Sequence, residues 1–215
     1  MPESLRGGVI GAGVFGGYHA AQYARLPGVT LSAVFDTHPE RAAAVAMPRG
    51  GRGFSDLEAF LAAVDVVTVA SPATVHAEQT LAAVAAGKHV YVEKPIAVRL
   101  ADAERVRAAA VARGVVLACG HQERVVFQAM GLLDIPEQPL LLEALRHGPP
   151  SPRSQDVSAV LDLMIHDIDL ALAICGSEPV TAEGEGALGP NGVWDQARAE
   201  TTFESGFTAI FEVYP

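Results

Sequence analysis

The chain has 215 residues, of which 50% are hydrophobic and 19% are charged, and its formal net charge is −10. This composition excludes a disordered chain, and the length suffices to bury a core. The acidic charge argues against a nucleic-acid partner, which would require a basic face. No apolar run is long enough to span a bilayer, and the first residues lack the pattern of an export signal. We therefore expect a cytoplasmic protein without a nucleic-acid or membrane partner.

The first 120 residues alternate strand-like and helix-like segments. Strands are expected at 7–13, 29–36, 65–72, 89–95 and 115–121, and helices at 14–25, 39–46, 76–88 and 100–114. Strands that alternate with helices of this length imply right-handed crossovers and a parallel sheet with helices on both faces. The sequence therefore predicts an α/β fold, a Rossmann dinucleotide-binding domain, over residues 1–121.

The pattern changes in residues 122–215. A strand is expected at 139–148, followed by a Pro/Ser-rich loop at 148–156 and a helix from Val160 to about Gly176. Further strands are expected at 179–187, 197–203 and 207–213, the last two joined by a tight turn. This predicts an α+β domain with a mainly antiparallel, open-faced sheet. Because four strands would leave a face or an edge uncovered, we expect either a truncated domain or burial by another subunit.

Gly11, Gly13 and Gly16 form a G-x-G-x-x-G pattern between the first strand and the first helix. The first glycine allows the tight turn, the second lets a pyrophosphate approach the backbone, and the third lets the helix pack on the strand. Asp36 ends the second strand 20 residues after Gly16, near the spacing of the acid that binds a ribose 2′-hydroxyl. A carboxylate there favours NAD over NADP, although Arg41 could weaken that preference. The alternative is a structural glycine turn followed by a surface aspartate.

Glu93, Lys94 and Pro95 stand at the carboxyl end of a predicted parallel strand, where open α/β sheets bind their ligands. Lys94 is one of only two lysines among fifteen basic residues. An ammonium group can donate to a reacting oxygen and change its own protonation, which a guanidinium does not do in practice. A surface lysine in a salt bridge is the alternative interpretation.

The sequence resembles the Gfo/Idh/MocA oxidoreductases, the group of glucose–fructose oxidoreductase and inositol dehydrogenase. The matching segments occur in family order, at residues 9–20, 34–42, 65–97 and 161–170. The resemblance implies a Rossmann domain and a C-terminal open-faced sheet that carries substrate and homo-oligomer contacts. It also implies NAD(P)-dependent oxidation or reduction at a hydroxyl carbon of a sugar, cyclitol or nucleotide sugar.

The resemblance also assigns roles to residues. Lys94 matches the family's catalytic lysine, and Asp162 and His166 match its Asp-x-x-x-His pair. The residues expected to contact the cofactor are Gly11, Gly13, Val14, Phe15, Gly16, Asp36, Ser71, Pro72, His76, Glu93 and Lys94. Within the family, residues 160–172 are most similar to bacterial enzymes that act on UDP-linked amino sugars, such as UDP-N-acetylglucosamine 3-dehydrogenases. A free polyol or inositol is an alternative substrate.

The segment "VLDLMIHDIDLAL", 160–172, places charges in an apolar helix. On an α-helix that turns about 100° per residue, Ser158, Asp162, His166 and Asp169 lie within about 80° of one another, whereas Asp167 points away. We expect His166 to be the general base and Asp162 to orient the imidazole or the substrate. Lys94 would stabilise the reacting oxygen. Which of Lys94 and His166 makes the main proton transfer stays open, and a solvated stripe is the structural alternative.

Two further alternatives remain at this point. A metal site at Asp162 and His166 would need a third ligand, for which His121 is the nearest candidate, and we expect no metal. Cys119 and Cys175 are expected to be reduced. The chain could also be a non-catalytic NAD-binding sensor or scaffold, or an inactive fragment of such an enzyme.

Overall fold

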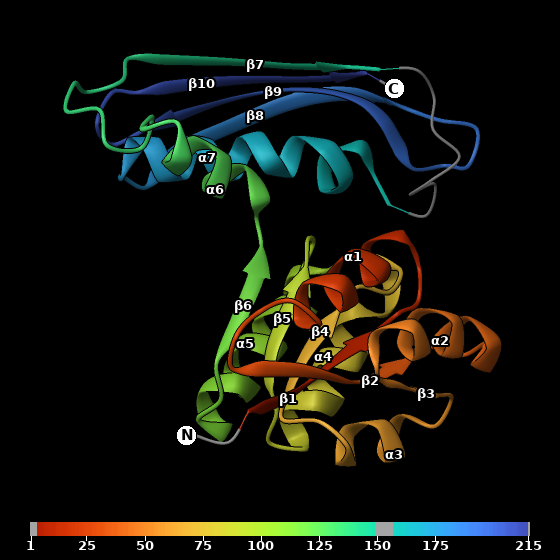
Figure 1. The fold of residues 1–215 in the computed structure, drawn as a ribbon. Coiled ribbons are helices and arrows are strands. Elements are labelled where there is room, and N and C mark those ends of the chain that lie inside the picture. The colour runs from red at the N-terminus through yellow and green to blue at the C-terminus, as the bar shows by residue number, and fades with distance from the viewer. Residues whose placement is uncertain (1–3, 149–156, 215) are drawn as a thin grey trace. The chain divides into compact units, whose positions relative to one another are not determined.

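The computed structural model describes residues 4–148 and 157–214 and divides the chain into two compact units, Met1–Gly120 and His121–Pro215 (Figure 1). The division falls one residue before the boundary expected from the sequence. The Pro/Ser-rich loop expected at 148–156 lies outside the described residues, except for Gly148.

The first unit is built on a six-stranded sheet in the order β3-β2-β1-β4-β5-β6, and every neighbouring pair is parallel. The strands are β1 (Leu5–Ile10), β2 (Val29–Phe35), β3 (Arg52–Phe54), β4 (Val66–Val69), β5 (His89–Glu93) and β6 (Leu117–Gly120). This order is that of the dinucleotide-binding Rossmann fold. The α/β prediction is therefore confirmed.

Five α-helices connect these strands: α1 (Val14–Tyr23), α2 (Pro39–Ala46), α3 (Leu57–Ala62), α4 (His76–Ala85) and α5 (Leu100–Arg113). Two single 3₁₀ turns, η1 (Met47–Arg49) and η2 (Ala73–Val75), lie beside α2 and α4. Pro39 begins α2, and Gly114 ends α5 with a φ of 70°, as the turn residues predict. Strand β3 and helix α3 were not predicted, because three and six residues are too short for a clear periodic pattern.

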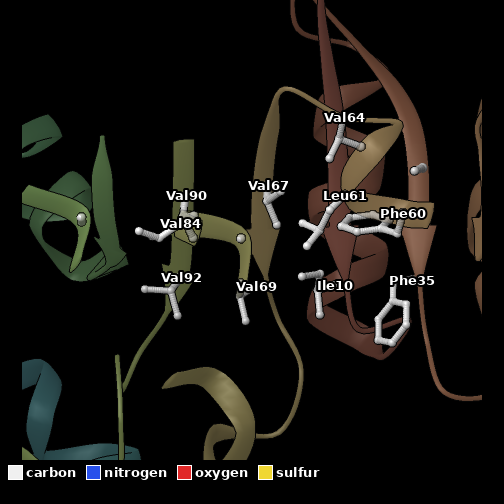
Figure 2. Packing of buried hydrophobic residues seen from close by; sticks show 13 residues of the cluster. Ile10, Phe35, Phe60, Leu61, Val64, Val67, Val69, Val84, Val90 and Val92 are labelled. Atoms are coloured by element: carbon white, nitrogen blue, oxygen red, sulfur yellow. The ribbon is translucent and has the colours of Figure 1, made fainter. Parts of the chain in front are cut away.

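The core of this unit lies on both faces of the sheet because successive strand residues alternate in direction. Val9 packs on one face with residues of α1 and α2, namely Ala20, Ala42 and Ala46. Ile10 packs on the opposite face with residues of α3, α4 and α5. Figure 2 shows this second cluster, in which the labelled side chains are Ile10, Phe35, Phe60, Leu61, Val64, Val67, Val69, Val84, Val90 and Val92. The sheet is thus held between two helical layers.

The second unit contains a four-stranded sheet in the order β7-β10-β9-β8. Its strands are β7 (Leu141–His147), β8 (Pro179–Leu188), β9 (Trp194–Phe203) and β10 (Thr208–Tyr214). Strand β9 pairs antiparallel with β8 and β10, whereas β7 and β10 are parallel. The expected mainly antiparallel α+β unit is therefore confirmed. Helix α6 (Gln122–Ala129), which precedes β7, was not predicted.

Helix α7 (Ile165–Cys175) covers one face of this sheet (Figure 1). Met164, Ala171 and Cys175 pack against the aromatic side chains of Phe207 and Phe211 in a common apolar cluster. Within the described part of this unit, no helix lies on the opposite face, and every residue of β8 is exposed. The sheet is open-faced, as expected.

The prediction of one continuous α-helix from Val160 is wrong for its first turn. Residues Val160–Met164 form a π-helix, η3, in which the N–H of Ile165 donates to the carbonyl of Val160, five residues earlier. A π-helix advances by a smaller angle per residue than an α-helix, so the 100° estimate does not apply before Ile165. Such π segments occur frequently at functional sites.

Two expectations from composition can be compared with the fold. Neither Cys119 nor Cys175 is part of a disulfide in the described structure. Among the helices that the structure describes, none is both long and apolar enough to cross a membrane.

Candidate functional site

The carboxyl ends of four adjacent strands form the candidate site of the first unit. The glycine turn 11–16 follows strand β1, Asp36 follows β2, Ser71 lies two residues after β4, and Glu93 is the last residue of β5. Because β2, β1, β4 and β5 are neighbours and parallel, these segments emerge at one edge of the sheet. The strand order reverses direction between β1 and β4, and open α/β sheets bind ligands at that point.

The three glycines of the turn have different physical roles. Gly11 has a φ of +99°, and a Cβ there would lie 2.7 Å from the carbonyl oxygen of Ala70. A Cβ at Gly16 would lie 1.8 Å from the carbonyl oxygen of Gly11, so only glycine allows α1 to approach the turn. At Gly13 nothing lies within 4 Å of the corresponding position. The open space therefore lies at the glycine expected to face the pyrophosphate.

Asp36 ties the end of β2 to the glycine turn. Its carboxylate accepts hydrogen bonds from the backbone N–H groups of Ala12 and His38, both at 2.9 Å. Burial raises the pKa of Asp36, but these two hydrogen bonds and the nearby His38 ring outweigh it, so the pKa lies below its ordinary value. Asp36 is therefore an anion at neutral pH, fixed beside the turn.

The residues of this edge fit a dinucleotide. Gly13 is the N-cap of α1 and offers no side chain to the first N–H groups of the helix, and the first turn contains no acidic residue. These N–H groups form an anion-binding helix end beside open space. The fixed Asp36 carboxylate can accept a hydrogen bond from a ribose hydroxyl. The arrangement is that of a pyrophosphate and ribose site.

Glu93 contacts a histidine that sequence reasoning did not single out. The ring of His19, on α1, donates from Nε2 to Oε1 of Glu93 at 2.6 Å, and its centroid lies 5.4 Å from that of Tyr91. Burial, followed by the charge of Glu93, raises the pKa of Tyr91. A Cβ at Gly120 would lie 2.6 Å from the Tyr91 hydroxyl oxygen, so the glycine makes room for this group. Glu93 is thus held between α1 and β6.

His76 joins two loops of the same edge. Its ring is 2% exposed, and its Nδ1 and Nε2 lie 2.8 Å from the carbonyl oxygens of Pro95 and Ser71, respectively. The Ser71 hydroxyl donates to Oε1 of Gln79 at 2.5 Å. The Lys94–Pro95 peptide bond is cis. The side chain of His76 therefore connects the loop after β4 to the backbone that follows Lys94.

The second unit carries a compact group of charged side chains beneath its sheet. Nδ1 of His166, on α7, lies 2.5 Å from Oε2 of Glu123, on α6. Arg124, also on α6, binds Asp169 through two hydrogen bonds of 2.5 and 2.6 Å. Asp162 lies in the π-helical turn that precedes α7. Of the four polar residues predicted to share a stripe, His166 and Asp169 contact α6, and Asp162 lies in the turn before α7.

Two aspartates of α7, Asp167 and Asp169, have arginine partners that the sequence did not indicate. Asp169 is in a bidentate ion pair with Arg124, and this pair raises the pKa of the guanidinium. Asp167, which was expected to point away, is buried in a second bidentate pair with Arg146 of β7, at 2.6 and 2.7 Å. Both aspartates have lost most contact with water and are compensated by arginines. Each carboxylate is thus compensated within the second unit.

Sequence reasoning missed Glu123, Arg124 and Arg146. Arg124 pairs with Asp169, 45 residues later in the sequence, and Arg146 pairs with Asp167, 21 residues later. No local sequence pattern is informative over such separations. In residues 4–148 and 157–214, no three His, Cys, Asp or Glu side chains are grouped to hold a metal ion.

Comparison with known proteins identifies the family. Residues 5–121 match the family model described as "Oxidoreductase family, NAD-binding Rossmann fold", and residues 145–214 match the model of the GFO/IDH/MocA C-terminal domain. The chain belongs to the Gfo/Idh/MocA oxidoreductase family. The expected resemblance and fold are confirmed, and so is NAD(P) binding as a property of the matched domain.

Individual Gfo/Idh/MocA relatives differ in their substrates. The UDP-N-acetylglucosamine 3-dehydrogenase of Acidithiobacillus ferrooxidans is 38% identical over 207 residues, which cover 95% of this chain and 65% of that protein. An inositol 2-dehydrogenase of Cereibacter sphaeroides is 33% identical over 189 residues, covering 84% of this chain and 57% of that protein. The chain thus spans somewhat less than two-thirds of the length of these relatives.

Solved structures of the Gfo/Idh/MocA family have the same fold. The structure of the Acidithiobacillus ferrooxidans enzyme superposes with a TM-score of 0.89 at 37% identity, covering 98% of this chain and 67% of that one. GenD2 from gentamicin A biosynthesis, solved in complex with NAD, superposes with a TM-score of 0.86 at 28% identity, covering 100% of this chain and 66% of that one.

Proposed function

We propose that the chain is an NAD-dependent dehydrogenase that transfers a hydride between a hydroxyl carbon of a sugar derivative and the nicotinamide. The observation that carries this proposal is the edge where β2, β1, β4 and β5 end. That edge combines a side-chain-free helix N-terminus at Gly13 with the ionised carboxylate of Asp36. Glu93 ends the neighbouring strand β5, and Lys94 follows it.

A nucleotide sugar is the favoured substrate class. The relative at 38% identity is a UDP-N-acetylglucosamine 3-dehydrogenase, and the same enzyme gives a TM-score of 0.89. An inositol or another free polyol is the second candidate, since an inositol 2-dehydrogenase is 33% identical. Both candidates require the same chemistry, removal of a hydroxyl proton and of a hydride from the carbon that carries it.

NAD is favoured over NADP as the cofactor. When bound, NAD would supply the hydride acceptor. Asp36 would accept a hydrogen bond from the ribose 2′-hydroxyl, and its negative charge would repel the phosphate that NADP carries at that position. The N–H groups at the start of α1 would bind the pyrophosphate, and Ser71, Pro72 and Glu93 would line the remainder of the cofactor site.

Three side chains would handle the substrate proton. His166 would accept the hydroxyl proton as the general base, because the ordinary pKa of histidine lies near neutral pH. Asp162 would orient the imidazole or the substrate. Lys94 would hold the reacting oxygen and stabilise the negative charge that develops on it. His76 would act as a positioning residue, because its ring joins the loop after β4 to the backbone that follows Lys94.

We also propose that the chain forms a homo-oligomer through the open face of the β7-β10-β9-β8 sheet. This face includes the exposed Trp194 and Tyr214 together with charged residues of β8 and β9 such as Glu183 and Arg198. Light scattering coupled to gel filtration tests the proposal. A mass of one chain at all concentrations would reject it.

The activity test is NAD reduction, followed by the ultraviolet absorbance of the reduced nicotinamide, across UDP-sugars, inositols and free polyols. We expect turnover with UDP-N-acetylglucosamine. Replacing His166→Asn should lower turnover about a hundredfold while the Kd for NAD stays unchanged. NAD binding without turnover on any compound would favour a cofactor-binding sensor or an incomplete enzyme instead.

A further inference from the structure

We propose that Glu123 is the positioning residue of His166: it holds the proton on Nδ1 and thereby makes Nε2 the nitrogen that exchanges a proton with the substrate. The inference rests on the proposed function in that it takes His166 as the base. It concerns only α6, β7, η3 and α7 of the second unit.

The first support is the geometry of the contact. Oε2 of Glu123 and Nδ1 of His166 are 2.5 Å apart, and the side chains are 20% and 7% exposed. Both atoms are individually inaccessible to solvent. A buried carboxylate oxygen at this distance can only be stable against an imidazole nitrogen that carries a proton, since two acceptors would repel each other. The short distance favours the neutral tautomer that carries its proton on Nδ1.

The second support is that two positive groups lie beside Glu123. It lies in the first turn of α6, where the free N–H groups of a helix stabilise negative charge. Nη2 of Arg146, on β7, lies 3.8 Å from its other oxygen, Oε1. The same arginine binds Asp167 in a bidentate pair, so β7 anchors both the carboxylate of α6 and a carboxylate of α7. Glu123 is thus held in place by its neighbours rather than being a mobile surface group.

The chemical consequence concerns the charge of the ring. When Nε2 takes the hydroxyl proton of the substrate, the imidazole becomes a cation with both nitrogens protonated, and Glu123 stays a carboxylate. The new positive charge then faces a negative one at 2.5 Å, so the protonated product of this step is stabilised. Other charged or titratable groups around the ring are Asp162 on η3, Asp167 and Asp169 on α7, Arg124 on α6, Arg146 on β7, and His121.

This assignment differs from the expectation that Asp162 orients the ring. Glu123 occupies the Nδ1 side, and it reaches His166 from a separate helix rather than from the preceding turn. The two possibilities make different predictions for the protonation of His166, and a direct measurement separates them.

The test is NMR of the chain with ¹⁵N-labelled histidine, which reports the tautomer and the titration midpoint of each ring; His166 is assigned from its loss in His166→Gln. We expect the Nδ1–H tautomer in the unaltered chain. In Glu123→Gln the titration midpoint of His166 should fall by about one pH unit or more, because an opposite charge within a few ångströms has that effect. In Glu123→Asp the titration midpoint of His166 should stay close to that of the unaltered chain. In the control Glu185→Gln, which changes an exposed carboxylate on β8, the midpoint should be unchanged.

Kinetics provide the second readout. In Glu123→Gln the acidic limb of the pH profile of kcat should move in the same direction as the midpoint, and kcat near neutral pH should fall about tenfold or more with the Kd for NAD unchanged. An Nε2–H tautomer, or a midpoint in Glu123→Gln equal to that of Glu185→Gln, would overturn the proposal. A shift found only in Asp162→Asn would also overturn it. Because the NMR readout needs no turnover, failure of the dehydrogenase assay alone leaves this test decisive.

Discussion

The glycines at the start of α1 allow substitution by alanine to separate folding from cofactor binding. At Gly16 the added Cβ would lie 1.8 Å from the Gly11 carbonyl oxygen, and that backbone atom must move by at least about 1.2 Å to reach 3.0 Å. Overpacking of a rigid site costs about 1–3 kcal/mol, occasionally more. We therefore expect Gly16→Ala to destabilise the first unit by about 3 kcal/mol.

Gly17 and Gly13 are the matched controls. At Gly17, one residue further along α1, nothing lies within 4 Å of the added Cβ, so Gly17→Ala should stabilise the chain by about 1 kcal/mol through helix propensity. Gly13 has a φ of −78°, which alanine adopts easily, and its Cβ would also meet open space. Gly13→Ala should therefore change stability by less than about 1 kcal/mol.

Binding should follow a different order from stability. The Cβ at Gly13 would enter the space proposed for the pyrophosphate, and the loss of one hydrogen bond to a charged group raises the Kd by about ten- to a hundredfold. Gly17→Ala should bind NAD normally. Urea unfolding followed by circular dichroism gives the stabilities, and calorimetric titration with NAD gives the Kd values. Normal NAD binding by Gly13→Ala, or equal stability of Gly16→Ala and Gly17→Ala, would refute the reasoning.

Three other substitutions test single interactions. Hydrogen bonds from Arg6 hold the pKa of Asp65 at about 2, below its ordinary 3.8, so this stabilisation is complete above about pH 4 and is lost as the pH falls toward 2. The melting temperatures of wild type and Asp65→Asn should converge over that window, and a constant difference would contradict the assignment. Asp167→Asn should lower the free energy of unfolding in urea by about 2 kcal/mol. The loss is smaller than for a fully buried pair because the Arg146 side chain is 32% exposed. A loss below about 0.5 kcal/mol would show that the pair is unimportant. Asp36→Asn should lower the preference for NAD over NADP about tenfold in kcat/KM, and an unchanged ratio would remove Asp36 from cofactor selection.

The sequence was sufficient for most of the first unit, although not for β3 and α3, because its signals are local. The glycine turn, the residues that end each strand and the glycine that ends α5 all act within a few residues of their own position. Strand alternation then determines the edge at which Asp36 and Lys94 emerge, since parallel neighbours end on the same side. The choice of the turn glycines and Asp36 as candidate cofactor residues follows from these rules, whereas Ser71, Pro72, His76 and Glu93 depend on the family resemblance.

The second unit required three-dimensional information. The π-helical turn at Val160–Met164 has no recognised sequence pattern, and it invalidates angular estimates that cross it. The partners of Asp167, Asp169 and His166 come from β7 and α6, and opposite charges in a chain can pair in many ways. Only the folded arrangement reveals that two of the three acidic residues of α7 and its preceding turn are neutralised by arginines while His166 faces Glu123.

Hydride transfer itself is the central claim, and an isotope measurement tests it most directly. The chain is incubated with NAD and UDP-N-acetylglucosamine that carries deuterium at carbon 3, and the reduced cofactor is examined by mass spectrometry. The account predicts reduced cofactor containing the deuterium, and strongly diminished formation of it in His166→Asn. Cofactor that remains oxidised with this sugar and with every polyol and inositol of the panel, despite measurable binding of NAD, would contradict the account.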